Sequence, residues 1–204
     1  TMGNMNLNPE FTHSSNFEYR TGNREKFSWF GTFIDASYTT NKIVSKSWYD
    51  DNGVQYTQPY NDGTGVYSLS GRAMYNSKIA KSNFSIGSMT FVRFGNGITY
   101  VAEKGDYVKN ITQTLSLSEH LTLSYRNDFI EVRAGGRVNY QNAWYSVQSI
   151  DKVATWTNEI TGSVNATIPG GVNIVTDIAH KFYIGYGDGY GDNSTVWNAE
   201  ISKQ

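Results

Sequence analysis

Alternation between apolar and polar residues, with a period of two, is the feature that most constrains how this chain can fold. In residues 154–168, one parity carries Trp156, Ile160 and Val164, and the other carries mostly hydroxyl, amide and carboxylate side chains. Successive side chains of a β-strand point to opposite faces, so this pattern predicts a strand with one apolar and one polar face. Residues 111–125 and 130–140 repeat the pattern.

Weaker forms of the same alternation extend this prediction over most of the chain. They occupy residues 27–39, 65–75, 84–94 and 172–182, with partial strands near residues 16–20 and 195–202. We therefore expect an all-β fold, an antiparallel meander of about nine strands.

The segments between the expected strands alternate in length. Short turns at 21–26, 76–82, 126–128 and 169–171 are interleaved with longer segments at 41–62, 95–105, 141–152 and 185–194. Outer-membrane β-barrels have short turns at one end and long loops at the other. The sorting therefore favours a transmembrane outer-membrane β-barrel, with one face of the sheet toward lipid and one toward a polar lumen.

Composition agrees with a barrel wall and argues against several other classes. Aromatic residues make up 15% of the chain, and mean hydropathy is only −0.50. Because alternate residues of such a wall face water, low mean hydropathy does not argue against a membrane. No apolar run approaches the roughly 20 residues of a spanning helix. With 17 basic and 18 acidic residues, the chain lacks the basic excess of a nucleic-acid binder, so we expect no nucleic-acid partner.

Glu119 is the exception within the best-defined alternation. It lies on the apolar parity of residues 111–125, where a carboxylate facing lipid is costly. A β-bulge at Glu119 and His120 shifts the register and resolves the conflict, and it is the interpretation we favour. The alternative is that Glu119 meets another protein surface.

Charged residues on the polar parity are the candidate functional residues. In a lumen they tune which solutes pass, or they pair across strands and hold the wall together, and both interpretations stay open. The possible lumen-lining residues are Arg72, Arg93, Glu131, Arg133 and Arg137.

We expect no catalytic, cofactor-binding or metal site, and hence no enzyme and no cofactor. His13, His120 and His180 are the only histidines and lie far apart in the sequence. The glycine- and aspartate-rich run at 185–193 lacks the repeated copies of calcium-binding β-helices, and we expect it to form a loop. The run at 50–53 lacks the glutamate that completes an EF-hand loop, and we expect a turn there. The absence of cysteine removes disulfides and thiolate ligands.

Four segments together carry a resemblance to a known family. They are KIVSKSWYDDNGVQYTQPYN (42–61), LSLSEHLTLSYRNDFIEVRAGGRVNY (115–140), IPGGVNIVTDIAHKF (168–182) and VWNAEISKQ (196–204). In order and spacing, they resemble the C-terminal barrel region of the Bacteroidetes outer-membrane β-barrel proteins related to TonB-dependent receptors. The resemblance extends over nearly the whole chain.

The resemblance implies that residues 1–204 are a single segment of a larger outer-membrane β-barrel domain, without its plug and closing strands. The start, TMGNMNLNPEF, has no basic and apolar export signal, which fits the expectation of a fragment. The implied function is transport of a nutrient ligand across the outer membrane of a bacterial cell. The implied partners are outer-membrane lipid and, through the rest of the full-length protein, the TonB system and a surface-exposed partner.

The rival interpretation is a soluble, secreted β-sandwich or adhesin-like module that binds glycans through exposed aromatic side chains. It predicts that the apolar parity faces a dry core and that loops of mixed length lie at both ends.

Overall fold

The computed structural model describes residues 2–50, 52–103, 106–147, 154–187 and 192–203, and all regular elements in these ranges are β-strands. Among these residues, no helix is long and apolar enough to cross a membrane.

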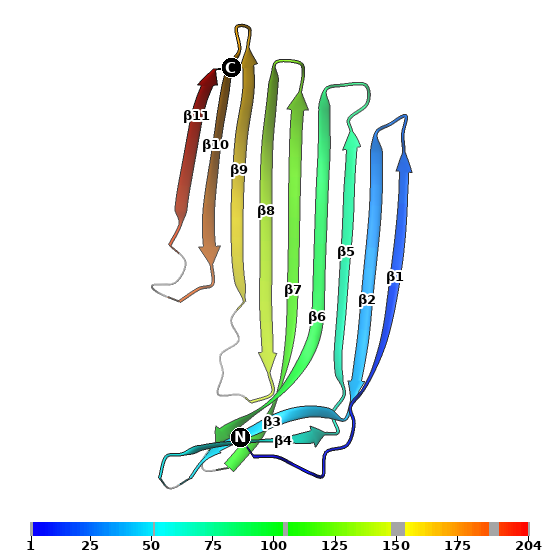
Figure 1. Ribbon diagram of the computed structural model, residues 1–204, viewed down its shortest axis with the longest axis vertical. Helices are drawn as coiled ribbons and strands as arrows, with labels where there is room; N and C mark the ends of the chain where they lie inside the picture. The colour runs from blue at the N-terminus through cyan, green and yellow to red at the C-terminus, as the bar shows by residue number, and fades with distance from the viewer. Residues whose placement is uncertain (1, 51, 104–105, 148–153, 188–191, 204) are drawn as a thin grey trace.

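Nine antiparallel strands form the main sheet, and they lie side by side in chain order apart from one insertion (Figure 1). The strands are β1 (Phe11–Asn23), β2 (Ser28–Thr40), β5 (Val66–Lys78), β6 (Phe84–Glu103), β7 (Asp106–Arg126), β8 (Ile130–Tyr145), β9 (Thr155–Ile168), β10 (Val172–Ile184) and β11 (Ser194–Lys203). The sheet is open, with β1 and β11 as its two edges. The prediction of an all-β antiparallel meander is confirmed.

The insertion is a hairpin between β2 and β5, made of β3 (Lys42–Tyr49) and β4 (Gln55–Asp62). It forms a separate two-stranded sheet and crosses the lower end of the main sheet in Figure 1, where β6 and β7 bend toward it. The Asp50 carboxylate accepts the backbone N–H groups of Asn52 and Val54, each at 2.9 Å, and this closes the hairpin turn. The described residues 50, 52 and 53 thus form a turn where one was expected, but between two paired strands and not within a loop; residue 51 lies outside the described residues.

Unbroken registers sort the side chains of the main sheet onto two faces. Leu117 of β7 pairs with Val92 of β6 and with Tyr140 of β8. Directly paired residues point to the same face, so one parity continues from strand to strand across the sheet. This defines an apolar face, and the opposite parity defines a polar face. Representative residues of the apolar face, one from each strand, are Phe17, Ile34, Leu69, Val92, Leu117, Val138, Ile160, Ile178 and Trp197.

The bulge predicted at Glu119 and His120 is wrong. Glu119 pairs with Thr90 and Val138, and His120 pairs with Met89 and Arg137, in a register that continues along all of β7. The Glu119 carboxylate therefore does lie on the apolar face. It stays there because one oxygen accepts the Ser88 hydroxyl at 2.8 Å and the other accepts the Thr90 hydroxyl at 2.5 Å. Cross-strand hydrogen bonds, and not a shifted register, therefore satisfy this carboxylate on the apolar face.

Three of the segments predicted as long loops contain strand instead. Residues 41–62 hold β3 and β4, residues 95–103 continue β6, and residues 141–145 continue β8. The alternation is weak in the hairpin because apolar residues such as Ile43 and Val44 are adjacent in sequence. The four short turns do lie together at the upper end of the sheet in Figure 1.

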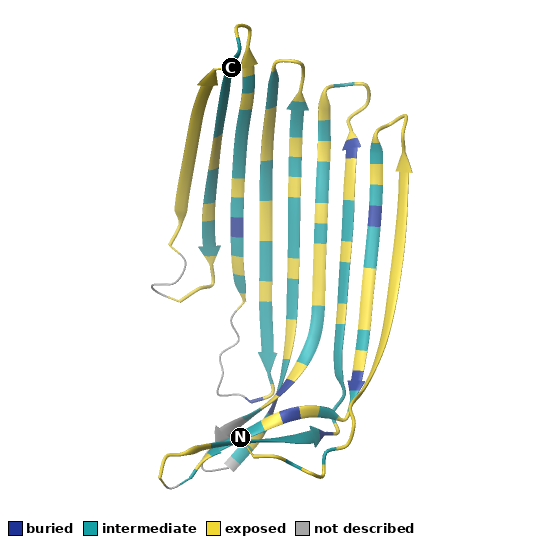
Figure 2. Cartoon of the chain, in the orientation of Figure 1, coloured by how far each residue is buried: buried dark blue, intermediate teal, exposed yellow. Residues whose placement is uncertain are grey.

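Burial is concentrated where the hairpin meets the sheet. The buried apolar side chains among the described residues are Val44, Ile98 and Val147, which come from β3, from the lower part of β6 and from the segment after β8. Figure 2 shows exposed and half-buried residues over most of the upright strands. On the apolar face, Ile160 is 60% exposed and Trp197 is 71% exposed. Within the described ranges, the hairpin covers the lower end of this face at β6 and β7, and no second layer covers the rest of it.

Alanine substitutions at two glycines in the lower part of β6 test how closely β5 and β6 approach each other. A Cβ at Gly95 lies 2.8 Å from the Tyr67 carbonyl oxygen, a backbone atom next to the Ser68–Gly95 pair, whereas a Cβ at Gly97 meets nothing within 4 Å. We expect Gly95→Ala to lower the free energy of unfolding by about 1–3 kcal/mol. Gly97→Ala, as the matched control, should change it by less than about 0.5 kcal/mol. Denaturant unfolding followed by circular dichroism measures both, and equal effects would contradict the strand register.

Candidate functional site

The structure places all five predicted lumen-lining residues on one face of the sheet. Arg72 lies on β5, Arg93 on β6, and Glu131, Arg133 and Arg137 lie on β8. Each belongs to the parity opposite to the apolar residues, so they share the polar face. The four arginine side chains are exposed and the glutamate is half-buried. Their common location is a consequence of register, and their role in a lumen remains a proposal.

Glu131 forms ion pairs with two neighbouring arginines near the short-turn end of the polar face. Its Oε1 accepts the Arg133 Nε–H at 2.6 Å, and its Oε2 lies 3.6 Å from Arg126 Nε. The glutamate side chain is 19% exposed, but the two arginines are largely in solvent. Pairs that are open to water contribute at most about 1 kcal/mol each. Glu131 therefore mainly orients these two guanidinium groups.

Arg72 is held by an aromatic ring and has no carboxylate partner among the described residues. Its guanidinium carbon lies 4.7 Å from the centre of the Phe33 ring, and the Arg20 guanidinium lies 5.0 Å from the same ring. A cation over an aromatic face gains roughly 0.5–1 kcal/mol at an exposed site. The Arg20 side chain also pairs with Glu18 at 2.5 Å. Phe33 thus keeps Arg72 extended on the polar face with its charge uncompensated.

Arg93 borders two adjacent hollows on the polar face, of about 450 and 330 Å³. Thr114 lines both hollows. Gly95 and Gly97 form part of the smaller one because they leave no side chain above the backbone. Ser116 and Gln141 line the larger hollow and add hydroxyl and amide groups.

A third hollow, of about 500 Å³, lies closer to the short turns. Trp29 and Met89 form apolar parts of its lining, and His120, Arg126 and Arg133 form polar parts. All five belong to the polar parity. Each of the three hollows on the polar face is therefore lined by at least one arginine.

Other polar groups on the apolar face, besides Glu119, also have partners within the sheet. The Trp197 indole N–H donates to the Thr176 hydroxyl at 2.8 Å, and His180 Nδ1 lies 2.8 Å from the Thr195 hydroxyl. A polar group without a partner is costly in an apolar medium, and a local hydrogen bond removes most of that cost.

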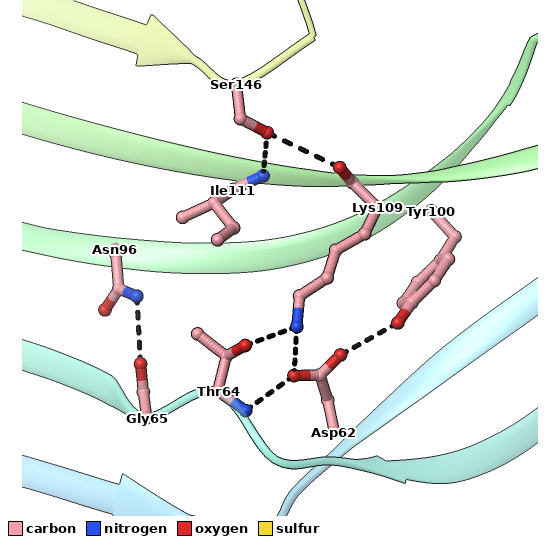
Figure 3. Close-up of polar contacts among 8 residues, drawn as sticks. All are labelled: Asp62, Thr64, Gly65, Asn96, Tyr100, Lys109, Ile111 and Ser146. Atoms are coloured by element: carbon pink, nitrogen blue, oxygen red, sulfur yellow. Dashed lines mark hydrogen bonds and ion pairs between the residues drawn. The ribbon is translucent and has the colours of Figure 1, made fainter.

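A buried ionic cluster, which sequence analysis did not find, joins the hairpin to the main sheet (Figure 3). The Asp62 side chain is only 4% exposed. Its Oδ1 accepts Lys109 Nζ at 2.5 Å and the Thr64 backbone N–H at 2.7 Å, and its Oδ2 accepts the Tyr100 hydroxyl at 2.8 Å. Lys109 Nζ also donates to the Thr64 hydroxyl. No sequence pattern connects these residues, because Asp62 and Lys109 lie 47 positions apart.

The pKa of the Asp62 carboxyl reflects two opposing effects. Burial acts to raise the pKa, but hydrogen bonds from Lys109 and Thr64 stabilise the ionised form more strongly, so the pKa lies below its ordinary value of 3.8. The pKa of Glu10, just before β1, is also lowered, by hydrogen bonds from the Ile43 backbone N–H and from Lys42. Both carboxylates tie the hairpin to neighbouring segments.

The other side of the extended β6–β7 pair is covered as well. Asn110 is 3% exposed, and its side-chain amide donates to the Thr112 hydroxyl at 3.1 Å. The Ile111 backbone N–H donates to the Ser146 hydroxyl at 2.8 Å (Figure 3). The Asn110 side-chain oxygen accepts the Val147 backbone N–H at 3.4 Å. The lower ends of β6 and β7 are therefore packed on both faces, unlike the rest of the sheet.

The histidines do not converge on a site. His13 lies on β1, His120 on the polar face of β7 and His180 on the apolar face of β10. Among the residues that the structure describes, no group of three His, Asp or Glu side chains is placed to hold a metal ion. Part of the glycine- and aspartate-rich run, residues 188–191, lies outside the described residues.

The fold defines an all-β protein whose main element is an open, antiparallel meander with one apolar and one polar face. No protein-family model, curated protein or solved structure matches the chain.

The Asp62 cluster predicts how the hairpin is held in place. Asp62→Ala removes the acceptor of the Tyr100 hydroxyl and the carboxylate partner of Lys109, and loss of a buried partner typically costs about 1–3 kcal/mol. We expect faster backbone hydrogen exchange in β3 and β4 and unchanged exchange in β9 and β10. Asp35→Asn, at an exposed carboxylate on β2, is the matched control and should leave the hairpin protected. Unchanged exchange in Asp62→Ala would contradict the anchoring role.

Because the Asp62 carboxylate must be ionised to anchor the hairpin, we expect the hairpin to lose stability at low pH. Because the folded-state pKa of Asp62 is lowered, its stabilising contribution is complete above its ordinary pKa of 3.8 and is lost as the pH falls through the folded-state value. Hairpin protection should therefore be constant from neutral pH down to about pH 4 and fall below that. Hydrogen exchange across this range measures the effect. Asp62→Asn should reduce the loss in acid, and the loss that remains reflects the Glu10 carboxylate.

Proposed function

We propose that this chain is a wall segment of an outer-membrane β-barrel of the TonB-dependent receptor type, which takes part in uptake of a nutrient ligand. The observation that carries the proposal is the continuous apolar face of a nine-stranded sheet, uncovered above the hairpin end, opposite a polar face that bears the stripe of arginines. Large exposed apolar areas mark contact with a membrane or with another protein. The alternating faces of these strands fit a lipid boundary on one side and water on the other.

The length of the strands supports a membrane-spanning role. β2, β5 and β10 have 13 residues each, and a transmembrane strand needs about 9–11 residues when tilted. The central strands β6 and β7 are longer, with 20 and 21 residues, and they continue past their neighbours at the hairpin end. In the proposed orientation, these extensions and the hairpin lie at the outward-facing mouth, opposite the short turns.

Backbone chemistry supports closure of the sheet within a barrel. A membrane offers no water to unpaired N–H and C=O groups, so strands are stable there only when both edges are paired. In the proposed barrel, the outer edges of β1 and β11 pair with further strands.

The soluble glycan-binding alternative requires the apolar face to pack against a second layer. Ile178 is 48% exposed and Val132 is 36% exposed, and both belong to the side that this alternative places in a dry core. Within the described residues nothing covers them. The membrane proposal accounts for this exposure without an additional layer.

Two tryptophans on opposite faces provide the test. Trp197 lies on the apolar face and Trp29 on the polar face. In single-tryptophan variants of the full chain reconstituted into liposomes, phospholipids brominated on their acyl chains should quench Trp197 strongly and Trp29 weakly. Aqueous acrylamide should show the opposite order. Trp156 replaces Trp197 as a second apolar-face reporter, because it pairs with Ile184 on that face.

The matched comparison uses phosphatidylcholine without bromine, in which both reporters should keep their full emission. Equal bromine quenching of Trp29 and Trp197, or a chain that stays monomeric in detergent-free buffer, would contradict the membrane assignment.

A further inference from the structure

Positive charge is concentrated on the middle strands of the polar face. Among the described side chains of β5–β8 on this face, six are cationic and Glu131 is the carboxylate. The six cations are Arg72, Lys78, Arg93, Arg126, Arg133 and Arg137. This basic stripe contrasts with a net charge of −1 for the whole chain.

On the flanking strands of the polar face, acidic side chains outnumber basic ones. β1 and β2 carry Glu18 and Asp35, and β9–β11 carry Glu159, Asp177 and Glu200. Their cations are Arg20 and Lys181, which lie 2.5 Å from Glu18 and 3.7 Å from Glu159. The acidic flanks border the basic stripe on both sides, and such a pattern directs an anion toward the middle strands.

Within the described residues, three arginines of the stripe have no ion-pair partner. Arg72 packs on Phe33 and Arg93 borders the two hollows, as described above. Arg137 pairs in register with Glu159, but that carboxylate lies near Lys181. Like charges on neighbouring strands cost stability when nothing compensates them.

Arg72 and Arg93 occupy diagonal positions, because Arg93 pairs with Ser70, two residues before Arg72. Diagonal neighbours on paired strands are roughly 7–8 Å apart. Arginine side chains at that separation can each form a bidentate contact with a different anionic group of one ligand. The hydroxyl and amide groups of Thr114, Ser116 and Gln141 lie beside Arg93 and can donate further hydrogen bonds to the same ligand.

We propose that the basic stripe is a recognition surface for a small solute with two or more phosphate, sulfate or carboxylate groups, centred on Arg72 and Arg93. Resting on the proposed function, this assigns the chemical class of the transported ligand. The ligand replaces the missing carboxylate partners and relieves the repulsion between the arginines.

Equilibrium binding of defined anions to the full chain in detergent micelles tests this assignment. The probes are benzene-1,3,5-tricarboxylate and inorganic pyrophosphate, and benzene-1,3,5-tricarboxamide is the uncharged match. Both anions should bind, more weakly as salt is raised, and the tricarboxamide should not. Arg72→Gln and Arg93→Gln should each weaken binding roughly tenfold, as expected for the loss of one charge-assisted contact. Arg93→Lys should have a smaller effect because it keeps the charge.

Arg24→Gln is the matched control, since it removes the same charge from the exposed turn between β1 and β2. It should leave affinity within about twofold of the parent chain, because screening limits its reach to the stripe. An equal loss in Arg24→Gln and Arg93→Gln, equal binding of the tricarboxamide, or binding of an acidic peptide but of neither small anion would overturn the proposal. An unchanged β-sheet spectrum in each variant separates lost binding from lost folding.

Failure of this proposal is distinguishable from failure of the proposed function. Anion binding that depends on Arg72 and Arg93, with no bromine quenching of Trp197, supports the recognition surface and overturns the membrane assignment. Strong quenching of Trp197 without anion binding supports the membrane assignment and overturns the recognition surface.

Discussion

The unbroken backbone ladder between antiparallel strands is the interaction on which the rest of the structure depends. Over most of its length, every strand from β2 to β10 in the main sheet is paired on both sides, so the N–H and C=O groups there have partners whatever medium surrounds the sheet. Because side chains alternate with a period of two, a one-residue slip in any pair would move an entire strand's apolar side chains to the polar face. The continuous register is therefore what creates two chemically distinct faces.

The two faces treat polar groups differently, and this difference supports the proposed environments. On the apolar face, Glu119 and Trp197 satisfy their hydrogen-bonding groups with hydroxyls of adjacent strands. On the polar face, Arg72 and Arg93 have no carboxylate partner among the described residues. A charge without a partner is tolerated where water or a ligand can reach it, and a polar group in an apolar medium needs a local partner. The exposed arginines are accordingly the groups available to a solute.

At the hairpin end, the sheet is packed on both sides instead of being exposed. There, β3 and β4 cover one side of the extended β6–β7 pair, and Ser146 and Val147 cover the other. This two-layer packing removes Asp62 from solvent, and a buried carboxylate requires a cation and donors nearby. Lys109 and Tyr100 meet this requirement. In the proposed barrel, this packed end lies at one end of the basic stripe and borders the proposed ligand surface.

The sequence by itself determined the all-β class, the approximate positions of nine strands and the common face of Arg72, Arg93, Glu131, Arg133 and Arg137. These follow from a period-two pattern, which is local and can be read one strand at a time. Only the tertiary structure decided the register through Glu119, the pairing of β3 with β4 and the contact between Asp62 and Lys109. These depend on which strands become neighbours, and residues such as Ser88 and Glu119, 31 positions apart, carry no sign of their contact in the local pattern.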